Sequence, residues 1–228
     1  MLRLKELYFG KFLKRYKRFF VDILYNDEII TLHNPNTGSM KSILEKDNLV
    51  AFSISDNEKR KLKYTMEGIK VGNHWFYTNT IAVNKIVEAA IYDNEISEFS
   101  EFYSVKREFR YKDSRIDFMI KLKNGRNALI EVKNVTMFDK DFAYFPDATT
   151  TRGFKHLNTL AESIADGFIP YMLYIIQSPN DRFKCADFID KDYCEKLKEL
   201  KETINVIVYK NIFEPEKSLC YLDKLNQT

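Results

Sequence analysis

The chain has 228 residues, of which 45% are hydrophobic, with 36 basic and 33 acidic side chains and a formal net charge of +3. This size allows one large domain or two small ones with real cores. The near balance of charge excludes net charge as an argument for nucleic-acid binding, so local clusters have to carry that argument. The sequence contains no run of membrane-spanning length and no leader-like apolar segment, and we expect a cytoplasmic protein that does not associate with membranes.

The cysteines at positions 185, 194 and 220 are odd in number and show no C-x-x-C spacing. This pattern predicts reduced intracellular thiols rather than a disulfide framework or a zinc site. The three histidines are scattered along the chain, which argues against a metal site built on histidine.

Residues 1–82 have the pattern of a small β-barrel. Short apolar runs are separated by hairpin-type breaks at Asn26-Asp27 and Gly72-Asn73, and one or two helical turns are expected over 38–44. Five short strands with a small helix predict a barrel of the OB type. The expected strands cover residues 18–24, 28–33, 49–55, 65–71 and 74–79.

Residues 83–228 predict a mixed sheet with helices on its faces. An amphipathic helix over 82–92 comes first, and the almost uninterrupted apolar run over 171–176 indicates a strand that is buried on both faces. The whole chain is therefore expected to be a two-domain protein of the α+β or α/β class. Further strands are expected over 103–111, 115–121, 127–135 and 204–209, a loop over 138–146, and helices over 151–166 and 191–202.

The stretch Arg115–Thr136 contains two strand-like runs around an Asn-Gly, which predicts a hairpin. A two-residue loop would mix charged residues into the apolar face. A three-residue loop over 123–125, with Gly125 at positive φ, places Phe118 opposite Ile130 and gathers all the apolar residues on one face. Burial therefore favours the three-residue loop.

The favoured register puts Asp117 opposite Glu131, with about 4.5–5.5 Å between their Cβ atoms. Such a pair can bind Mg²⁺ or Mn²⁺ together with water and phosphate, and the backbone carbonyl of Val132 is a further candidate ligand. Lys133 shares the strand face of Glu131 and would hold or activate the attacking water. Glu88, on the preceding helix, is a candidate to complete the metal shell. The alternative is a surface hairpin held by cross-strand ion pairs, with a solvated carboxylate on the helix.

Basic residues interleaved with aromatic ones indicate contact with nucleic acid, because cations bind phosphates and aromatic rings stack on bases. One such cluster is GKFLKRYKRFF over 10–20, and a second basic cluster lies over 59–63 of the same predicted barrel. A third group lies at the start of the helix over 151–166. The alternative for each group is a solvated surface beside core aromatics. The candidate nucleic-acid contacts are Lys11, Lys14, Arg15, Tyr16, Lys17, Arg18, Lys59, Arg60, Lys61, Arg152, Lys155 and His156.

Specific sequence blocks occur along nearly the whole chain. They are RYKRFFVDI at 15–23, HNPNTGSM at 33–40, SDNEKRKLKYT at 55–65, NTIAVNKIVEAAI at 79–91, SRIDFMI at 114–120, EVKNVT at 131–136 and FPDATTTRGFKHL at 145–157. In these blocks the chain resembles the sugar fermentation stimulation protein A (SfsA) family. The resemblance implies an OB-fold domain over 1–82 and a domain over 83–228 similar to PD-(D/E)XK nucleases. It also implies DNA binding, a link to sugar metabolism, and a metal site at Asp117, Glu131 and Lys133, with Glu88 as the helical acid.

Together these features predict a DNA-binding protein with a divalent-metal nuclease centre that hydrolyses phosphodiester bonds. Single- or double-stranded DNA is expected to bind with little sequence specificity, because the sequence shows no helix-turn-helix reader. The alternatives are a non-catalytic DNA-binding regulator that retains the nuclease fold, and RNA as the substrate.

Overall fold

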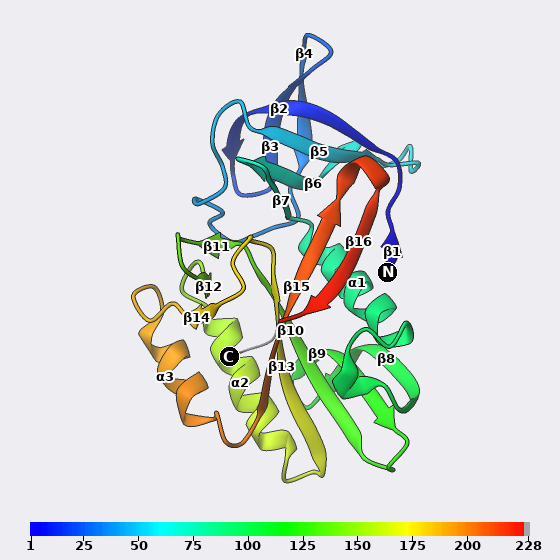
Figure 1. Ribbon diagram of the computed structural model, residues 1–228, viewed down its shortest axis with the longest axis vertical. Coiled ribbons are helices and arrows are strands. Elements are labelled where there is room, and N and C mark those ends of the chain that lie inside the picture. The colour runs from blue at the N-terminus through cyan, green and yellow to red at the C-terminus, as the bar shows by residue number, and fades with distance from the viewer. Residues whose placement is uncertain (226–228) are drawn as a thin grey trace.

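The computed structural model describes residues 1–225 and consists of two domains, one at each end of its long axis (Figure 1). The strands of the N-terminal domain follow the order β4-β3-β2-β5-β6-β7, and β4 also pairs with β6, which closes β2 to β6 into a barrel. The predicted OB-type barrel is therefore confirmed. Its strands are β2 (Leu7–Tyr16), β3 (Phe20–Tyr25), β4 (Glu28–His33), β5 (Leu49–Ile54), β6 (Tyr64–Val71) and β7 (His74–Tyr77).

The strand β2 is absent from the sequence prediction, which started the first strand at residue 18. Inside the basic cluster, apolar side chains alternate with cations, so that Phe12 is buried while Lys11 is exposed. Lys17 and Arg18 take positive φ values of 48° and 61° and form the turn into β3. The segment 38–44 contains a bend and a turn but no helix, so the expected helical turns there are wrong.

The second domain is a mixed sheet in the order β1-β16-β15-β13-β10-β9-β8. Parallel pairing joins β10, β13 and β15, and antiparallel pairing joins the strands on either side of them. This confirms the predicted mixed sheet. Its strands are β1 (Leu2–Arg3), β8 (Phe102–Tyr111), β9 (Ser114–Leu122), β10 (Asn127–Val135), β13 (Phe168–Ile176), β15 (Asn205–Glu214) and β16 (Leu219–Lys224).

Helices cover both faces of this sheet: α1 (Thr80–Tyr92) packs on one, and α2 (Thr151–Ser163) and α3 (Lys191–Glu199) pack on the other (Figure 1). The central strand β13 shows why. Leu173 and Ile175 join the core with α1, whereas the alternate residues Met172 and Tyr174 join the core with α2 and α3. The apolar run over 171–176 is thus buried on both faces, as predicted. None of the helices within residues 1–225 is long and apolar enough to cross a membrane.

A small sheet is formed by β11 (Met137–Phe138), β12 (Ala143–Phe145) and β14 (Phe183–Cys185). Of these strands, β12 and the end of β11 fall within 138–146, where the sequence predicted a loop. A disulfide joins Cys185 in β14 to Cys194 in α3, with 5.6 Å between their Cα atoms. The expectation of three reduced thiols is therefore wrong for this pair. The two cysteines are nine positions apart in sequence, and they meet because the fold brings β14 and α3 next to each other. Cys220 is a free, buried thiol.

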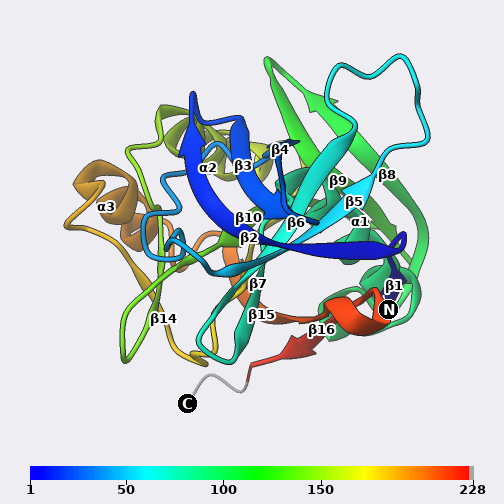
Figure 2. The same cartoon turned by 90° about the horizontal axis from the view of Figure 1, so that it is seen from above.

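The two domains are held together by aromatic packing and by the N-terminal strand β1, which joins the sheet of the second domain. The barrel strand β7 lies beside β15 (Figure 2), where the rings of Trp75 and Tyr77 pack edge-on against Phe213 at centroid distances of 6.1 and 4.9 Å. The first strand of the chain, β1, pairs with β16 in the sheet of the second domain rather than with the barrel. The two domains are therefore attached to each other at two places, the contact of β7 with β15 and the pairing of β1 with β16.

Candidate active site

The hairpin of β9 and β10 has the predicted three-residue loop. Phe118 lies opposite Ile130 and Lys121 opposite Asn127. The N–H of Gly125 donates to the carbonyl of Leu122 at 3.1 Å, and Gly125 has a φ of 84°. A side chain at this φ would be strained, so the glycine in the loop selects this turn.

The backbone pairing of β9 with β10 follows the predicted register and ends at Phe118, so Asp117 and Glu131 do not form the predicted backbone pair. There Oδ2 of Asp117 accepts the N–H of Val132 at 2.8 Å, so a carboxylate replaces the next backbone partner. Oδ1 of Asp117 accepts from the amide of Asn84 on α1 at 2.7 Å. Ile116 packs in the core with α2 and not with Phe118, so the expectation that all the apolar residues share one face is wrong here.

Glu131 lies in the middle of β10 and is only 3% exposed. Its Oε1 accepts from Nζ of Lys133 at 2.5 Å and from Nδ1 of His156 on α2. Its Oε2 is buried and has no hydrogen-bond partner among the described residues. One oxygen is thus held by two donors, and the other is available to a ligand.

His156, expected to bind nucleic acid, is instead a buried partner of Glu131 with an exposure of 3%. Its Nε2 accepts from Nε of Arg152 at 3.5 Å, so the ring proton resides on Nδ1 and is donated to Glu131. The N-terminus of α2 is fixed by Thr150, whose hydroxyl accepts the N–H of Gly153 at 3.0 Å. His156 therefore orients the carboxylate from a rigid helix.

The pKa values of the two carboxyl groups are shifted in opposite directions. Burial, followed by the negative charge of Glu131, raises the pKa of Asp117 to about 6. Burial opposes ionisation of Glu131 as well, but Lys133 and His156 outweigh it and lower the pKa of Glu131. The pKa of Asp117 thus stays raised although Val132, Lys133 and Asn84 act against the shift. Carboxyls perturbed in this way by burial and a charged neighbour cluster at functional sites.

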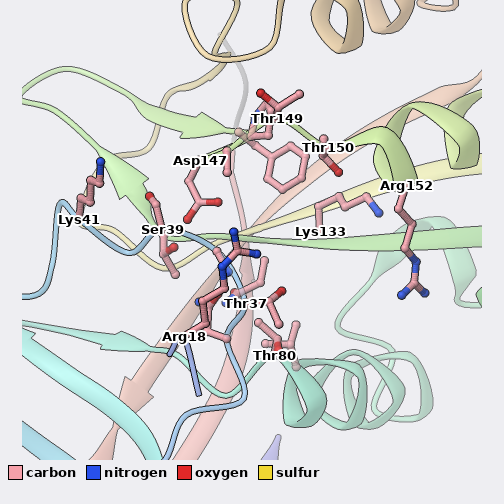
Figure 3. Close-up of a pocket in the computed structure, with 18 of the residues that line it drawn as sticks. Arg18, Thr37, Ser39, Lys41, Thr80, Lys133, Asp147, Thr149, Thr150 and Arg152 are labelled. Atoms are coloured by element: carbon pink, nitrogen blue, oxygen red, sulfur yellow. The ribbon is translucent and has the colours of Figure 1, made fainter. Parts of the chain in front are cut away.

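Both carboxylates line a cleft of about 780 Å³ between the barrel and the second domain. Figure 3 shows other side chains of its lining, among them Arg18, Lys133 and Arg152. Cations from both domains line the cleft: Lys17, Arg18 and Lys41 from the barrel side, and Lys133 and Arg152 from the other. The cleft walls also come from the block at 33–40 and the block at 145–157. The cleft is thus lined by cations, and the two carboxylates of Asp117 and Glu131 lie among them.

These two blocks meet across the cleft at Asp147. Its Oδ2 accepts the N–H of Met40 at 3.3 Å, and a Cβ at Gly38 would lie 2.5 Å from the same oxygen. A side chain at position 38 would therefore displace the carboxylate of Asp147 from this contact. Asn84 and Asp147 were missed by the sequence analysis, although both lie in blocks that carried the resemblance; the blocks alone gave them no role.

Several basic residues of the barrel do not line the cleft as free charges. The guanidinium of Arg15 donates to the carbonyls of Asn36, Gly38 and Ser39 at 2.8, 2.8 and 2.9 Å, so it supports the loop that forms the cleft wall. The other members of the first cluster divide. Nζ of Lys14 lies 3.5 Å from Oδ2 of Asp22, and Lys11 is exposed outside the cleft. Tyr16 stacks on Phe20 with ring centroids 5.4 Å apart and lines the cleft together with Lys17 and Arg18.

The remaining candidates lie away from the cleft. Lys59, Arg60 and Lys61 belong to another loop, and Arg60 lines a different cavity. Lys155 is exposed and pairs with Asp113 at 2.7 Å. Glu88 is one helical turn from Asn84, pairs with Arg107 at 3.2 Å, and does not line the cleft.

The residues present fit a divalent metal that takes part of its shell from elsewhere. Within residues 1–225 there is no group of three or more His, Cys, Asp or Glu side chains that could hold a metal. Asp117 and Glu131 nevertheless supply two carboxylates, and Glu131 has a buried oxygen that no group in the described part of the chain contacts by a hydrogen bond. Mg²⁺ and similar ions commonly bind one or two carboxylates and complete the shell with water and phosphate.

The chain joins a closed OB-type barrel to a mixed sheet. One hairpin of that sheet has an acid on its first strand and an acid-x-lysine pattern on its second, and both acids line the cleft. These features define a class of two-domain protein, an OB-type barrel joined to a nuclease-like domain. Residues 13–78 match the SfsA N-terminal OB domain, and residues 81–217 match the sugar fermentation stimulation protein RE domain. The chain belongs to the sugar fermentation stimulation protein family.

Curated relatives and a solved structure agree with this assignment. The sugar fermentation stimulation protein homolog of Pelagibacter ubique (strain HTCC1062) is 46% identical over 209 residues, covering 90% of both chains. That of Syntrophotalea carbinolica is 40% identical over 213 residues, covering 92% of this chain and 91% of the relative. The structure of Pyrococcus furiosus SfsA in complex with Ca²⁺ has a TM-score of 0.90 at 22% identity, covering 98% of this chain and 96% of that one. It has the same fold.

Proposed function

We propose that the protein binds DNA in the cleft between its domains and hydrolyses phosphodiester bonds with Mg²⁺ or Mn²⁺. The observation that carries the proposal is the state of Glu131. One of its oxygens is fixed by Lys133 and His156, and the other is buried without a partner among residues 1–225. Glu131 lies beside Asp117 in a cleft lined by cations. A buried, unpartnered carboxylate oxygen is costly unless it binds something positive.

Asp117, Glu131 and the backbone carbonyl of Val132 are the groups that would hold the metal. The Ca²⁺ complex of the Pyrococcus furiosus relative supports the use of a divalent cation. When bound, such an ion polarises the phosphoryl group and lowers the pKa of a bound water. Glu88, expected as a further ligand, is paired with Arg107 outside the cleft, so we assign it no ligand role. Asn84, one turn earlier on α1, holds Asp117 in place.

Lys133 is the residue best placed to act on the reacting atoms. Its ammonium already contacts Glu131, is mostly buried, and lines the cleft. From there it orients the attacking water or stabilises negative charge that develops on the phosphate. The hydrolysis is proposed to be an in-line attack by water, without a covalent intermediate.

The positive cleft supports DNA as the ligand. Lys17, Arg18, Lys41 and Arg152 are distributed over both walls, so a strand lying in the cleft contacts cations from both domains. These contacts address phosphates and carry no base specificity. The proposal therefore predicts little preference for sequence.

Cleavage of labelled single-stranded, double-stranded and flapped DNA in the presence of Mn²⁺ or Mg²⁺ tests the proposal. Asp117→Asn and Lys133→Gln should reduce the rate by at least a hundredfold while DNA binding persists. Glu88→Gln is the matched control, because Glu88 lies outside the cleft, and it should cut like the wild type. Equal, negligible cutting by all four proteins would overturn the nuclease proposal.

A non-catalytic DNA-binding regulator is the second candidate. Two observations favour it: Lys133 is engaged by Glu131, and the described residues contain no cluster of three metal-binding side chains. In that case the wild-type protein would bind DNA in the cleft and never cut it. The remaining alternative is RNA as the substrate. It is tested by replacing the DNA with RNA of the same sequence in the cleavage assay and in the binding assay.

A further inference from the structure

A second cavity, of about 640 Å³, lies between β14, α3 and β15. Among the described residues it shares no wall with the cleft that contains Asp117. Its size is that of an ordinary small-molecule pocket. Its lining consists of Phe142, Asp181, Arg182, Phe183, Lys184, Cys185, Cys194, Leu197, Lys198, Lys201, Val206 and Val208.

The lining combines an apolar surface with a cationic one. Leu197, Val206 and Val208 contribute the apolar part together with the disulfide. The cations are Arg182, Lys184, Lys198 and Lys201, and none of them forms an ion pair within residues 1–225. The one carboxylate in the lining, Asp181, is already engaged by Lys210 at 2.7 Å. The cavity lining therefore carries more positive than negative charge, although Asp139, outside the lining, interacts with Lys184.

Two of these cations are held in place by an aromatic ring. The guanidinium carbon of Arg182 lies 4.3 Å from the ring centroid of Phe142, and Nζ of Lys184 lies 3.7 Å from it. Cation–π contact of this kind restricts long side chains that would otherwise sample many rotamers. Both cations are thus restrained against the same ring in the lining of the cavity, and their charge would stabilise an anion bound in the cavity.

We propose that this cavity binds a small organic anion, in which a phosphate group meets the cations and an apolar or aromatic body packs on Leu197, Val206 and Val208. A nucleoside monophosphate has this chemistry. The cations of the lining match the phosphate group, and the apolar residues match the apolar or aromatic body. A bare phosphate would leave the apolar residues without contact, and an uncharged molecule would leave the cations without an anionic partner in the cavity. The site is independent of the proposed nuclease activity.

Isothermal titration calorimetry on the full-length protein, with AMP, adenosine and inorganic phosphate as probes, tests the inference. AMP should bind at least tenfold more tightly than either of the other two. Lys184→Glu and Lys201→Glu should each weaken AMP binding at least tenfold, because both side chains are exposed at the cavity and their charge is reversed. Far-UV circular dichroism confirms that both variants are folded.

The cleft supplies the matched control. Lys17→Glu and Arg18→Glu change charge at the other site, so they should leave AMP affinity unchanged, and an excess of single-stranded DNA should not displace AMP. The inference is overturned if the cleft variants lose AMP binding while the cavity variants retain it. It is equally overturned if inorganic phosphate binds as tightly as AMP, or if AMP does not bind at millimolar concentration.

Discussion

The imidazole of His156 donates from Nδ1 to Oε1 of Glu131 in the interior of the second domain. The contact joins α2 to the strand that carries the acid-x-lysine pattern. It reverses the role expected from the sequence, where His156 was grouped with phosphate-binding cations. A buried donor on a rigid helix fixes the direction of a carboxylate, and such partners tune how a carboxylate binds metal.

Replacing His156 should therefore weaken metal binding rather than DNA binding. We expect His156→Ala to reduce Mn²⁺ affinity by about 10- to 100-fold. His156→Asn should recover part of this loss, because its amide can donate from near the position of Nδ1. Calorimetry with Mn²⁺ and no DNA measures the effect. Reduced DNA affinity with unchanged Mn²⁺ affinity would restore the phosphate-binding role.

Arg15 is expected to act on stability, because its guanidinium donates to four backbone carbonyls, those of Arg18, Asn36, Gly38 and Ser39. Arg15→Ala should lower the free energy of unfolding by about 2 kcal/mol, the scale of charged hydrogen bonds. Arg15→Lys should not restore it, since an ammonium lacks the planar fork. Urea denaturation measures the change. The exposed Lys11→Ala is the control, with an expected change under about 0.5 kcal/mol.

Cations that line the cleft should dominate the salt dependence of DNA binding. We expect Arg18→Ala and Lys41→Ala each to weaken binding and to make the slope of log K against log salt less negative by about 0.9, the value for one lost phosphate contact. Fluorescence anisotropy over a series of salt concentrations measures the slope. Lys59→Ala and Lys61→Ala are charge-matched controls from the other loop. If the controls change the slope and the cleft variants do not, DNA binds elsewhere.

Glu67 should make the barrel less stable as the pH rises. Burial raises the pKa of this carboxyl, and hydrogen bonds from Ser53, Asn79 and Tyr77 offset only part of the shift. Because the folded-state pKa exceeds the unfolded value, the stabilising contribution is complete below the unfolded pKa, near 4.5, and is lost as the pH rises through the folded pKa.

Glu67→Gln tests this directly, because an amide can keep the same three partners without a charge. We expect the midpoint of thermal unfolding to fall less between pH 4.5 and pH 7 in this variant than in the wild type. The exposed Glu45→Gln should keep the wild-type pH dependence. A wild-type profile that rises over the same interval, or an unchanged slope in Glu67→Gln, would contradict the assignment.

The hairpin of β9 and β10 could be predicted because its determinants are local. Gly125 selects the turn, and alternation of apolar residues selects the register up to Phe118 and Ile130. Backbone pairing ends at this pair, because the carboxylate of Asp117 accepts the N–H of Val132 in place of the next backbone partner. No periodicity encodes a side chain that substitutes for a backbone partner, and such substitutions are expected where a site interrupts a regular element.

The cations show a second limit of sequence reasoning. Residues 10–20 form one cluster in sequence, yet the fold assigns Arg15 to backbone carbonyls and Arg18 to the cleft. The disulfide between Cys185 and Cys194 depends likewise on where β14 and α3 meet. Composition and spacing identified the residue types, but tertiary contacts decided which partner each one found.

One carboxylate, Asp190, has a consequence for how the second domain comes apart. Its Oδ1 accepts the N–H of Tyr193 at the start of α3, and its Oδ2 accepts the N–H of Thr150, the cap of α2, at 3.1 and 2.7 Å. Two helix starts thus depend on a single side chain. Amide protons in the first turns of α2 and α3 should therefore exchange with solvent in one shared opening event, and the cleft wall at Thr150 should open with them.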